Sequence, residues 1–174
     1  IVRDSELLKS SLGTEERWRW FLQNFDENYE EYANEGVADL YVLCLTKYED
    51  TNADGNLSMW RGYGSEGKGC ALVFDTGILQ EMSSTPLMLA PVEYGTSEQR
   101  IVTIKSLVER LAIFFQEIEY PTDYLHAAAG DLFERIAMLA TYTKHIGFAE
   151  EKEWRLAYWK QRDDEESKLR KYFK

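Results

Sequence analysis

The chain has 174 residues, a formal net charge of −11 and only two cysteines. Its 44% hydrophobic and 14% aromatic content describes a globular protein, expected to be one domain that buries roughly two thirds of its unfolded surface. No run approaches the ~20 apolar residues that span a membrane. The acidic charge opposes nonspecific binding to a phosphate backbone, which needs clustered lysine and arginine.

The first 35 residues are predicted to be mostly helical, with a break at Gly13. Trp18 and Trp20 alternate with two arginines, a pattern that also occurs in nucleic-acid patches. On so acidic a chain, core packing of one tryptophan is the better interpretation. The apolar residues that recur at helical spacing are Leu7, Leu8, Leu12, Trp18, Phe21, Leu22 and Phe25.

Two strands are predicted next, at Leu40–Lys47 and Gly69–Asp75, because both segments are short apolar runs bounded by turn residues. The first is almost free of polar residues, which is typical of a strand in the middle of a covered sheet. Each strand holds one cysteine, Cys44 or Cys70. Buried free thiols are typical of a reducing compartment, so we expect a cytoplasmic protein.

The segment between these strands, Ser58–Gly64, combines two aromatic residues with an arginine and glycines. Glycine permits close approach of a ligand to the backbone, and Trp60 and Tyr63 offer flat faces for stacking. A small core packed beneath a loop would use the same residues.

The loop just before this segment resembles the first nine positions of an EF-hand calcium loop. The twelfth position should be a glutamate that binds the metal through both oxygens, but here it is Arg61. A cation there would repel calcium, so we expect no metal and assign the loop to turns. Calcium binding at Asp50, Asn52 and Asp54 is a weaker alternative.

Downstream, a strand is predicted at Leu87–Tyr94, with Pro91 indicating an edge or a bulge. Thr96 and Gln99 have the spacing of a capping box at a helix start. That helix ends before Pro121, and a second helix follows over residues 123–143. The two are expected to form a helical hairpin laid against the sheet.

The last informative stretch is a strand predicted at about Trp154–Trp159, preceded by Glu151 and Glu153. If the chain is already extended at these glutamates, both carboxylates point to the same side. A carboxylate at such a position can stabilise positive charge that develops in a transition state. The alternative is an exposed acidic turn paired with Lys144 or Arg155.

Three motifs follow one another over about residues 40–160. They are a strand ending at Thr46, Met59-Trp60-x-x-Tyr63 leading into Gly69-Cys70-Ala71-Leu72-Val73-Phe74, and Lys144-His145-x-x-Phe148-x-x-Glu151-x-Glu153-Trp154-Arg155. Together they resemble a bacterial family, the domain-of-unknown-function family 2971, and the last motif is the most specific. That family looks related to the ADP-ribosyltransferase superfamily and occurs in phage-defence and toxin contexts.

For the fold, the resemblance implies an α+β domain with a mixed, mostly antiparallel split sheet. A helical hairpin and an N-terminal helix are expected to pack around this sheet, within a single domain over residues 1–174. Family members generally carry a Tyr-Thr-Ser segment upstream of the first strand, and no such segment precedes Leu40. We therefore expect the chain to lack an N-terminal segment of the full family domain.

For the activity, the resemblance implies an ADP-ribosyltransferase-like protein that uses NAD as substrate, in the setting of a bacterial defence toxin. Glu153 would be the catalytic glutamate, and Glu151 would help to orient a nucleophile. Thr46 would take the position of the small hydroxyl residue that supports the NAD site, where family members usually have serine.

The remaining NAD contacts implied by the resemblance come from the two aromatic motifs. Trp60 and Tyr63 would wall the nicotinamide or ribose pocket, and Arg61 or Arg155 would neutralise the pyrophosphate. The acidic chain makes a protein or a small molecule a better acceptor than a nucleic acid. The alternative function is a non-catalytic binding module of the same fold, in which these motifs form packed core.

Overall fold

The structure is a computed structural model that describes residues 1–174 except 35–39, 49–56, 66–67, 76–85, 161–162 and 164–174. The described residues form helices and antiparallel strands, which confirms the predicted α+β class. They divide into two compact units, one of residues 1–37 and 95–143 and the other of residues 38–94 and 144–174. The prediction of one domain stays a prediction.

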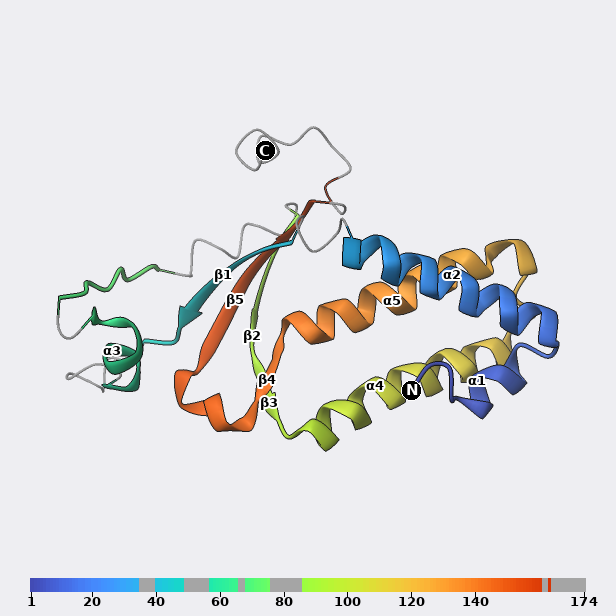
Figure 1. The fold of residues 1–174 in the computed structure, drawn as a ribbon, viewed down its shortest axis with the longest axis horizontal. Helices are drawn as coiled ribbons and strands as arrows, with labels where there is room; N and C mark the ends of the chain where they lie inside the picture. Colours follow the sequence, from blue (N-terminus) through green and yellow to red (C-terminus); the bar gives the residue numbers. More distant parts are fainter. Residues whose placement is uncertain (35–39, 49–56, 66–67, 76–85, 161–162, 164–174) are drawn as a thin grey trace. The chain divides into compact units, whose positions relative to one another are not determined.

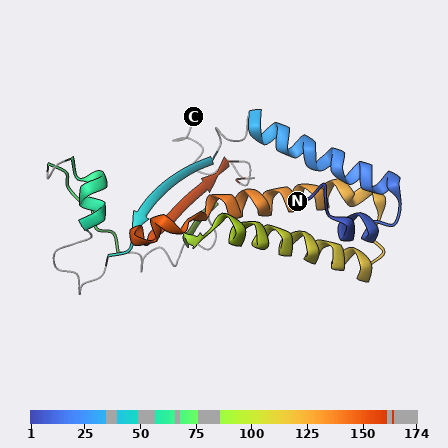
Figure 2. The same cartoon turned by 60° about the horizontal axis from the view of Figure 1, so that its bottom comes forward.

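The first unit is helical, and its helices lie side by side in Figures 1 and 2. Helix α2 packs against α5, and α1 packs against α4. Gly13 separates α1 from α2 with a φ of +80°, which confirms the predicted break. The helices are α1 (Glu6–Ser11), α2 (Glu15–Asn34), α4 (Ser97–Glu117) and α5 (Leu125–Thr141), with a short 3-10 turn, η4 (Thr122–Tyr124).

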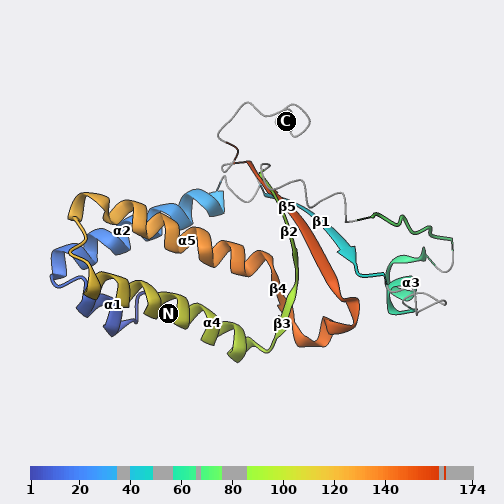
Figure 3. The same ribbon diagram turned by 180° about the vertical axis from the view of Figure 1, so that it is seen from behind.

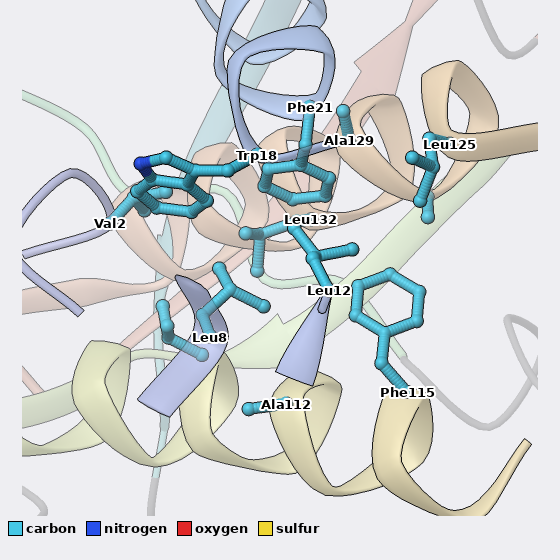
Figure 4. Close-up of a cluster of buried hydrophobic side chains, with 12 residues drawn as sticks. Val2, Leu8, Leu12, Trp18, Phe21, Ala112, Phe115, Leu125, Ala129 and Leu132 are labelled. Atoms are coloured by element: carbon cyan, nitrogen blue, oxygen red, sulfur yellow. The ribbon is translucent and has the colours of Figure 1, made fainter. Parts of the chain in front are cut away.

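The core of this unit is made of apolar side chains from all four α-helices (Figure 4). Trp18 is buried there and stacks on Phe21, which meets Phe115 edge to face. Trp18 is therefore a core residue, as expected, rather than part of a nucleic-acid patch. Burying each large apolar side chain stabilises the fold by about 1.5–3 kcal/mol.

The start of α4 is the predicted capping box. The Thr96 hydroxyl accepts a hydrogen bond from the Gln99 N–H, and the Gln99 side chain accepts one from the Thr96 N–H. These bonds satisfy backbone donors that a helix start leaves unpaired. Helix α4 ends before Pro121 and α5 packs against it, which confirms the helical hairpin. That the hairpin is laid against the sheet stays a prediction.

The second unit contains an antiparallel sheet with the order β1-β5-β2 (Figure 3). Its strands are β1 (Leu40–Thr46), β5 (Glu153–Trp159) and β2 (Leu87–Pro91). Two shorter strands, β3 (Glu93–Gly95) and β4 (Thr143–His145), pair with each other. The predicted strand over residues 87–94 is thus divided after Pro91, in line with the break that proline suggested.

Strand β1 corrects one prediction. It pairs with β5 on one side only and lies at an end of the described sheet, not in its middle. Val42 and Leu43 are 41% and 52% exposed, and Cys44 is exposed as well. An apolar run can be covered on both faces, but only neighbouring elements decide whether it is.

The segment Gly69–Asp75 corrects a second prediction, that these residues form a strand. It has no regular secondary structure, although its composition is that of a strand. Leu72 and Val73 are more than 70% exposed, and Cys70 is exposed, so neither cysteine is the buried thiol that was expected. A strand needs a partner for its backbone groups, which composition alone does not supply.

The residues of the alternative calcium site, Asp50, Asn52 and Asp54, lie outside the described residues. Within the part of the chain that is described, no helix is long and apolar enough to cross a bilayer.

Candidate functional site

A cluster of charged side chains lies at the start of β5, in the second unit. In the β1–β5 ladder Thr46 is opposite Glu153, and Cys44 is opposite Arg155. Residues directly opposite each other, and residues two apart on a strand, project from the same face of a sheet. This pairing therefore gathers the four side chains on one face.

Glu153 is the centre of the cluster and is only 6% exposed. Its Oε1 accepts a hydrogen bond from Arg155 Nε at 2.7 Å. Its Oε2 accepts from Lys144 Nζ at 3.0 Å and from Arg155 Nη2 at 3.3 Å. Both carboxylate oxygens are thus bound by cations.

These contacts decide the charge of Glu153. Burial by itself would raise the pKa of this carboxyl, since it disfavours the charged form. Hydrogen bonds from Arg155, Cys44 and Lys144, together with the charge of Arg155, outweigh burial and lower the pKa to about 2. Glu153 is therefore ionised at neutral pH.

Lys144, on β4, connects Glu153 to a second carboxylate. Its Nζ lies 2.5 Å from Glu151 Oε2 as well as 3.0 Å from Glu153 Oε2. Burial would lower the pKa of this ammonium, but hydrogen bonds to Glu151 and Glu153 and their charges raise it overall. The Nζ also lies 4.8 Å from the centre of the Phe148 ring, within the range of a cation–π contact.

A 3-10 helix, η5 (Ile146–Glu151), brings the two glutamates to this lysine; the turn between β4 and β5 is visible in Figure 1. At its start, His145 Nδ1 accepts a hydrogen bond from the Gly147 N–H. After its end, Lys152 takes a left-handed φ of 45° and returns the chain to β5. The chain at Glu151 is helical rather than extended, so the alternation of side chains along a strand does not place the two carboxylates together. They meet at Lys144 because η5 turns the chain back toward β4.

Further hydrogen bonds fix the backbone of this turn. The Thr46 hydroxyl donates to the Glu151 carbonyl at 2.5 Å. The Glu153 N–H donates to the Tyr94 hydroxyl at 2.8 Å, and the Lys47 N–H donates to the Lys152 carbonyl at 3.1 Å. Contacts from the end of β1 and from β3 therefore fix the chain at residues 151–153, where η5 leads into β5.

The predicted site residues fall into two groups. Thr46, Glu151, Glu153 and Arg155 come together in the cluster. The other group lies on helix α3 (Leu57–Tyr63), which contacts η5. This second group is Trp60, Arg61 and Tyr63.

None of the hydrogen bonds to Glu153 comes from the α3 group. Trp60 is 36% exposed and Tyr63 is 70% exposed, so neither ring is buried as the small-core interpretation required. Arg61 is exposed as well. Their part in a nucleotide pocket stays a prediction.

Sequence reasoning missed three members of the site. Lys144 was named in the family motif and as the partner of an exposed acidic turn but not as a site residue, and Tyr94 was named only as the end of a predicted strand. Cys44 was assigned to the core, but the residue as a whole is exposed. The pKa of its thiol is raised, first by partial desolvation of the sulfur and then by the hydrogen bond and charge of Glu153. A raised pKa favours the protonated form of the thiol, which is the less nucleophilic form. Lys144 had a signal in the sequence, because it precedes both glutamates within one block.

Among the described residues, no group of three or more His, Cys, Asp or Glu side chains could hold a metal ion. In the cluster itself, the carboxylates of Glu151 and Glu153 are both paired with the ammonium of Lys144.

The sequence pattern of a family described as a protein of unknown function, DUF2971, matches residues 59–156. The chain belongs to this family. The match covers more than half of the chain and includes most of α3, Lys144 and residues 146–153. No curated protein and no solved structure matches this DUF2971 chain.

Proposed function

We propose that this DUF2971 protein is an ADP-ribosyltransferase-like enzyme that uses NAD as substrate. The observation that supports the proposal is the charged cluster, in which an ionised Glu153 faces Thr46 across two strands, with Glu151 beside it. These are the three residues to which the family resemblance assigns the hydroxyl and carboxylate roles.

In the proposed reaction, the bond between nicotinamide nitrogen and ribose C1′ breaks, and its electron pair leaves with nicotinamide. The ribose gains the character of an oxocarbenium ion, whose positive charge the Glu153 carboxylate stabilises. The acceptor then forms a bond to C1′ and loses a proton, with Glu151 orienting the attacking group. A carboxylate acts most strongly in a water-poor site, and Glu153 is buried.

The α3 group completes the proposal. Trp60 and Tyr63 would stack against nicotinamide or ribose, and Arg61 or Arg155 would pair with the pyrophosphate. The acceptor would be a protein or a small molecule, since the chain carries a net charge of −11. We also propose a cytoplasmic bacterial setting and a role as a defence toxin, which inducible expression in bacterial cells would test through growth arrest.

One observation favours a second candidate, a non-catalytic binding module of the same fold. Both oxygens of Glu153 are already hydrogen-bonded to Lys144 and Arg155. A carboxylate held in this way also serves to lock the start of β5 in place. In that case the cluster is structural and the protein does not react with NAD. Loss of the cluster would then lower only the stability of the protein.

The test is nicotinamide release and label transfer from NAD labelled in its adenine ring, with bacterial proteins and small molecules offered as acceptors. We expect the wild-type protein to release nicotinamide and Glu153→Gln to lose about 100-fold or more, the loss typical of a removed electrostatic stabiliser. Glu109→Gln, an exposed position on α4, removes the same charge elsewhere and should keep wild-type activity. An inactive wild type, or a fully active Glu153→Gln, would refute the proposed function.

A further inference from the structure

Lys144 is the cation on which both carboxylates of the cluster converge. Its Nζ lies within hydrogen-bond distance of Glu151 Oε2 and of Glu153 Oε2. All three side chains are shielded from solvent, with exposures of 23%, 18% and 6% for Lys144, Glu151 and Glu153. Such an ammonium is poorly screened by water and salt.

The second cation of the cluster does not duplicate this contact. Arg155 directs Nε and Nη2 at Glu153. In the described part of the chain, the ion pair of Glu151 is with Lys144. Removal of the lysine charge would therefore leave Glu153 one cation and take from Glu151 its described partner.

Two carboxylates that share one site repel each other, and the pKa of one is then raised. The groups that face them are the Lys144 ammonium from β4, the Arg155 guanidinium from β5 and the Cys44 thiol from β1. The Lys144 ammonium is the one group in this set that contacts both carboxylates. It thus offsets their mutual repulsion.

The lysine is itself held in place, as a residue that orients others must be. Its backbone belongs to β4, and its ammonium lies over the Phe148 ring on η5. The same turn that carries Phe148 carries Glu151. The ammonium, the ring and the carboxylate therefore form one local unit closed by η5.

We infer that Lys144 is a positioning residue of this site, which holds the carboxylates of Glu151 and Glu153 side by side. The inference rests on the proposed function, because it assigns Lys144 the task of keeping one carboxylate ready for the ribose and the other ready for the acceptor. Lys144 acts through the glutamates and is not given a contact with NAD.

Carbon NMR titration of the glutamate carboxyls tests the inference without relying on turnover. The resonances of Glu151 and Glu153 are assigned from Glu151→Gln and Glu153→Gln. In Lys144→Met, we expect one of these carboxyls to titrate about one pH unit or more above its wild-type position. Lys105→Met, an exposed lysine on α4, removes the same charge elsewhere and should leave both titrations unchanged.

Turnover gives the second readout. Lys144→Met should lower kcat for nicotinamide release about tenfold or more with little change in KM, and Lys144→Arg should recover most of the loss. If Lys144→Met unfolds, as checked by circular dichroism, Lys144→Gln takes its place.

The outcomes separate the two ideas. Unchanged carboxyl titrations in the Lys144 variants, or a wild-type kcat in Lys144→Met, would overturn the inference. A wild-type protein without NAD turnover refutes the proposed function, while the titrations still decide whether Lys144 positions the two carboxylates.

Discussion

Thr46 lies directly opposite Glu153 in the β1–β5 ladder, and its hydroxyl donates a hydrogen bond to the carbonyl of Glu151. The hydroxyl that the resemblance assigns to support of the NAD site therefore already has a structural partner in this fold. It ties the end of β1 to the turn that carries both carboxylates. The same contact is expected whether or not the site binds NAD.

Thr46→Val tests this tie because valine keeps the shape of the side chain and removes the hydroxyl. We expect the free energy of unfolding to fall by about 1 kcal/mol, the usual net contribution of one hydrogen bond. Thr46→Ser keeps the hydroxyl and should restore most of that stability. Urea denaturation of the three proteins measures the effect, and equal midpoints for Thr46→Val and wild type would contradict it.

The lowered pKa of the Glu153 carboxyl predicts that the protein loses stability in acid. Its pKa in the folded protein is about 2, against an ordinary value of 4.5. The unfolded chain therefore binds a proton more readily than the folded chain. The stabilisation is present above pH 4.5 and is lost as the pH falls from about 4.5 toward 2.

Other carboxyls also titrate in this range, so the measurement is a difference between two proteins. Urea unfolding of wild type and Glu153→Gln should be followed from pH 6 to about pH 2. The stability advantage of the wild type should shrink as the pH falls. An advantage that stays constant over this range would show that Glu153 is not held ionised by its neighbours.

Gly13 and Gly62 make a matched pair of glycines. A Cβ added at either position would meet no atom within 4 Å, but Gly13 has a φ of +80° and Gly62 lies within helix α3. Gly13→Ala should therefore destabilise the protein by about 1 kcal/mol through backbone strain alone. Gly62→Ala should instead stabilise the protein by about 0.5–1 kcal/mol, because alanine is the better helix former.

Thermal unfolding of the two variants checks the signs. Gly13→Asn is the control, since asparagine tolerates the left-handed conformation better than alanine and should lose less stability. If Gly13→Ala and Gly62→Ala shift the melting temperature in the same direction, the conformational explanation is wrong.

Local signals were sufficient for helices α1, α2, α4 and α5, but not for α3, which lies in a segment expected to be a loop. The spacing of apolar residues over residues 1–35, the break at Gly13 and the capping box at Thr96 all depend on residues within a few positions of one another. Their predictions agree with α1, α2 and α4 for that reason. The strand before Trp159 was also found from its own residues, with its start misplaced by one position.

The strand environments needed the tertiary structure. Leu40–Thr46 and Gly69–Asp75 have similar apolar composition, yet the first pairs with β5 and the second has no regular structure. The burial of a strand depends on which elements lie beside it and on its two faces. Those neighbours are distant in the sequence.

At the candidate site, sequence alone determined which carboxylates to consider, Glu151 and Glu153, because they stand together in the family's most specific block. Only the tertiary structure decided their surroundings. It closed η5 so that Lys144 reaches both glutamates, and it brought Thr46 from more than 100 positions away to the same turn. Burial and charge pairing set the pKa of Glu153, and both arise from contacts between distant parts of the chain. The ionised state of Glu153 therefore depends on the fold and could not be read from the motif.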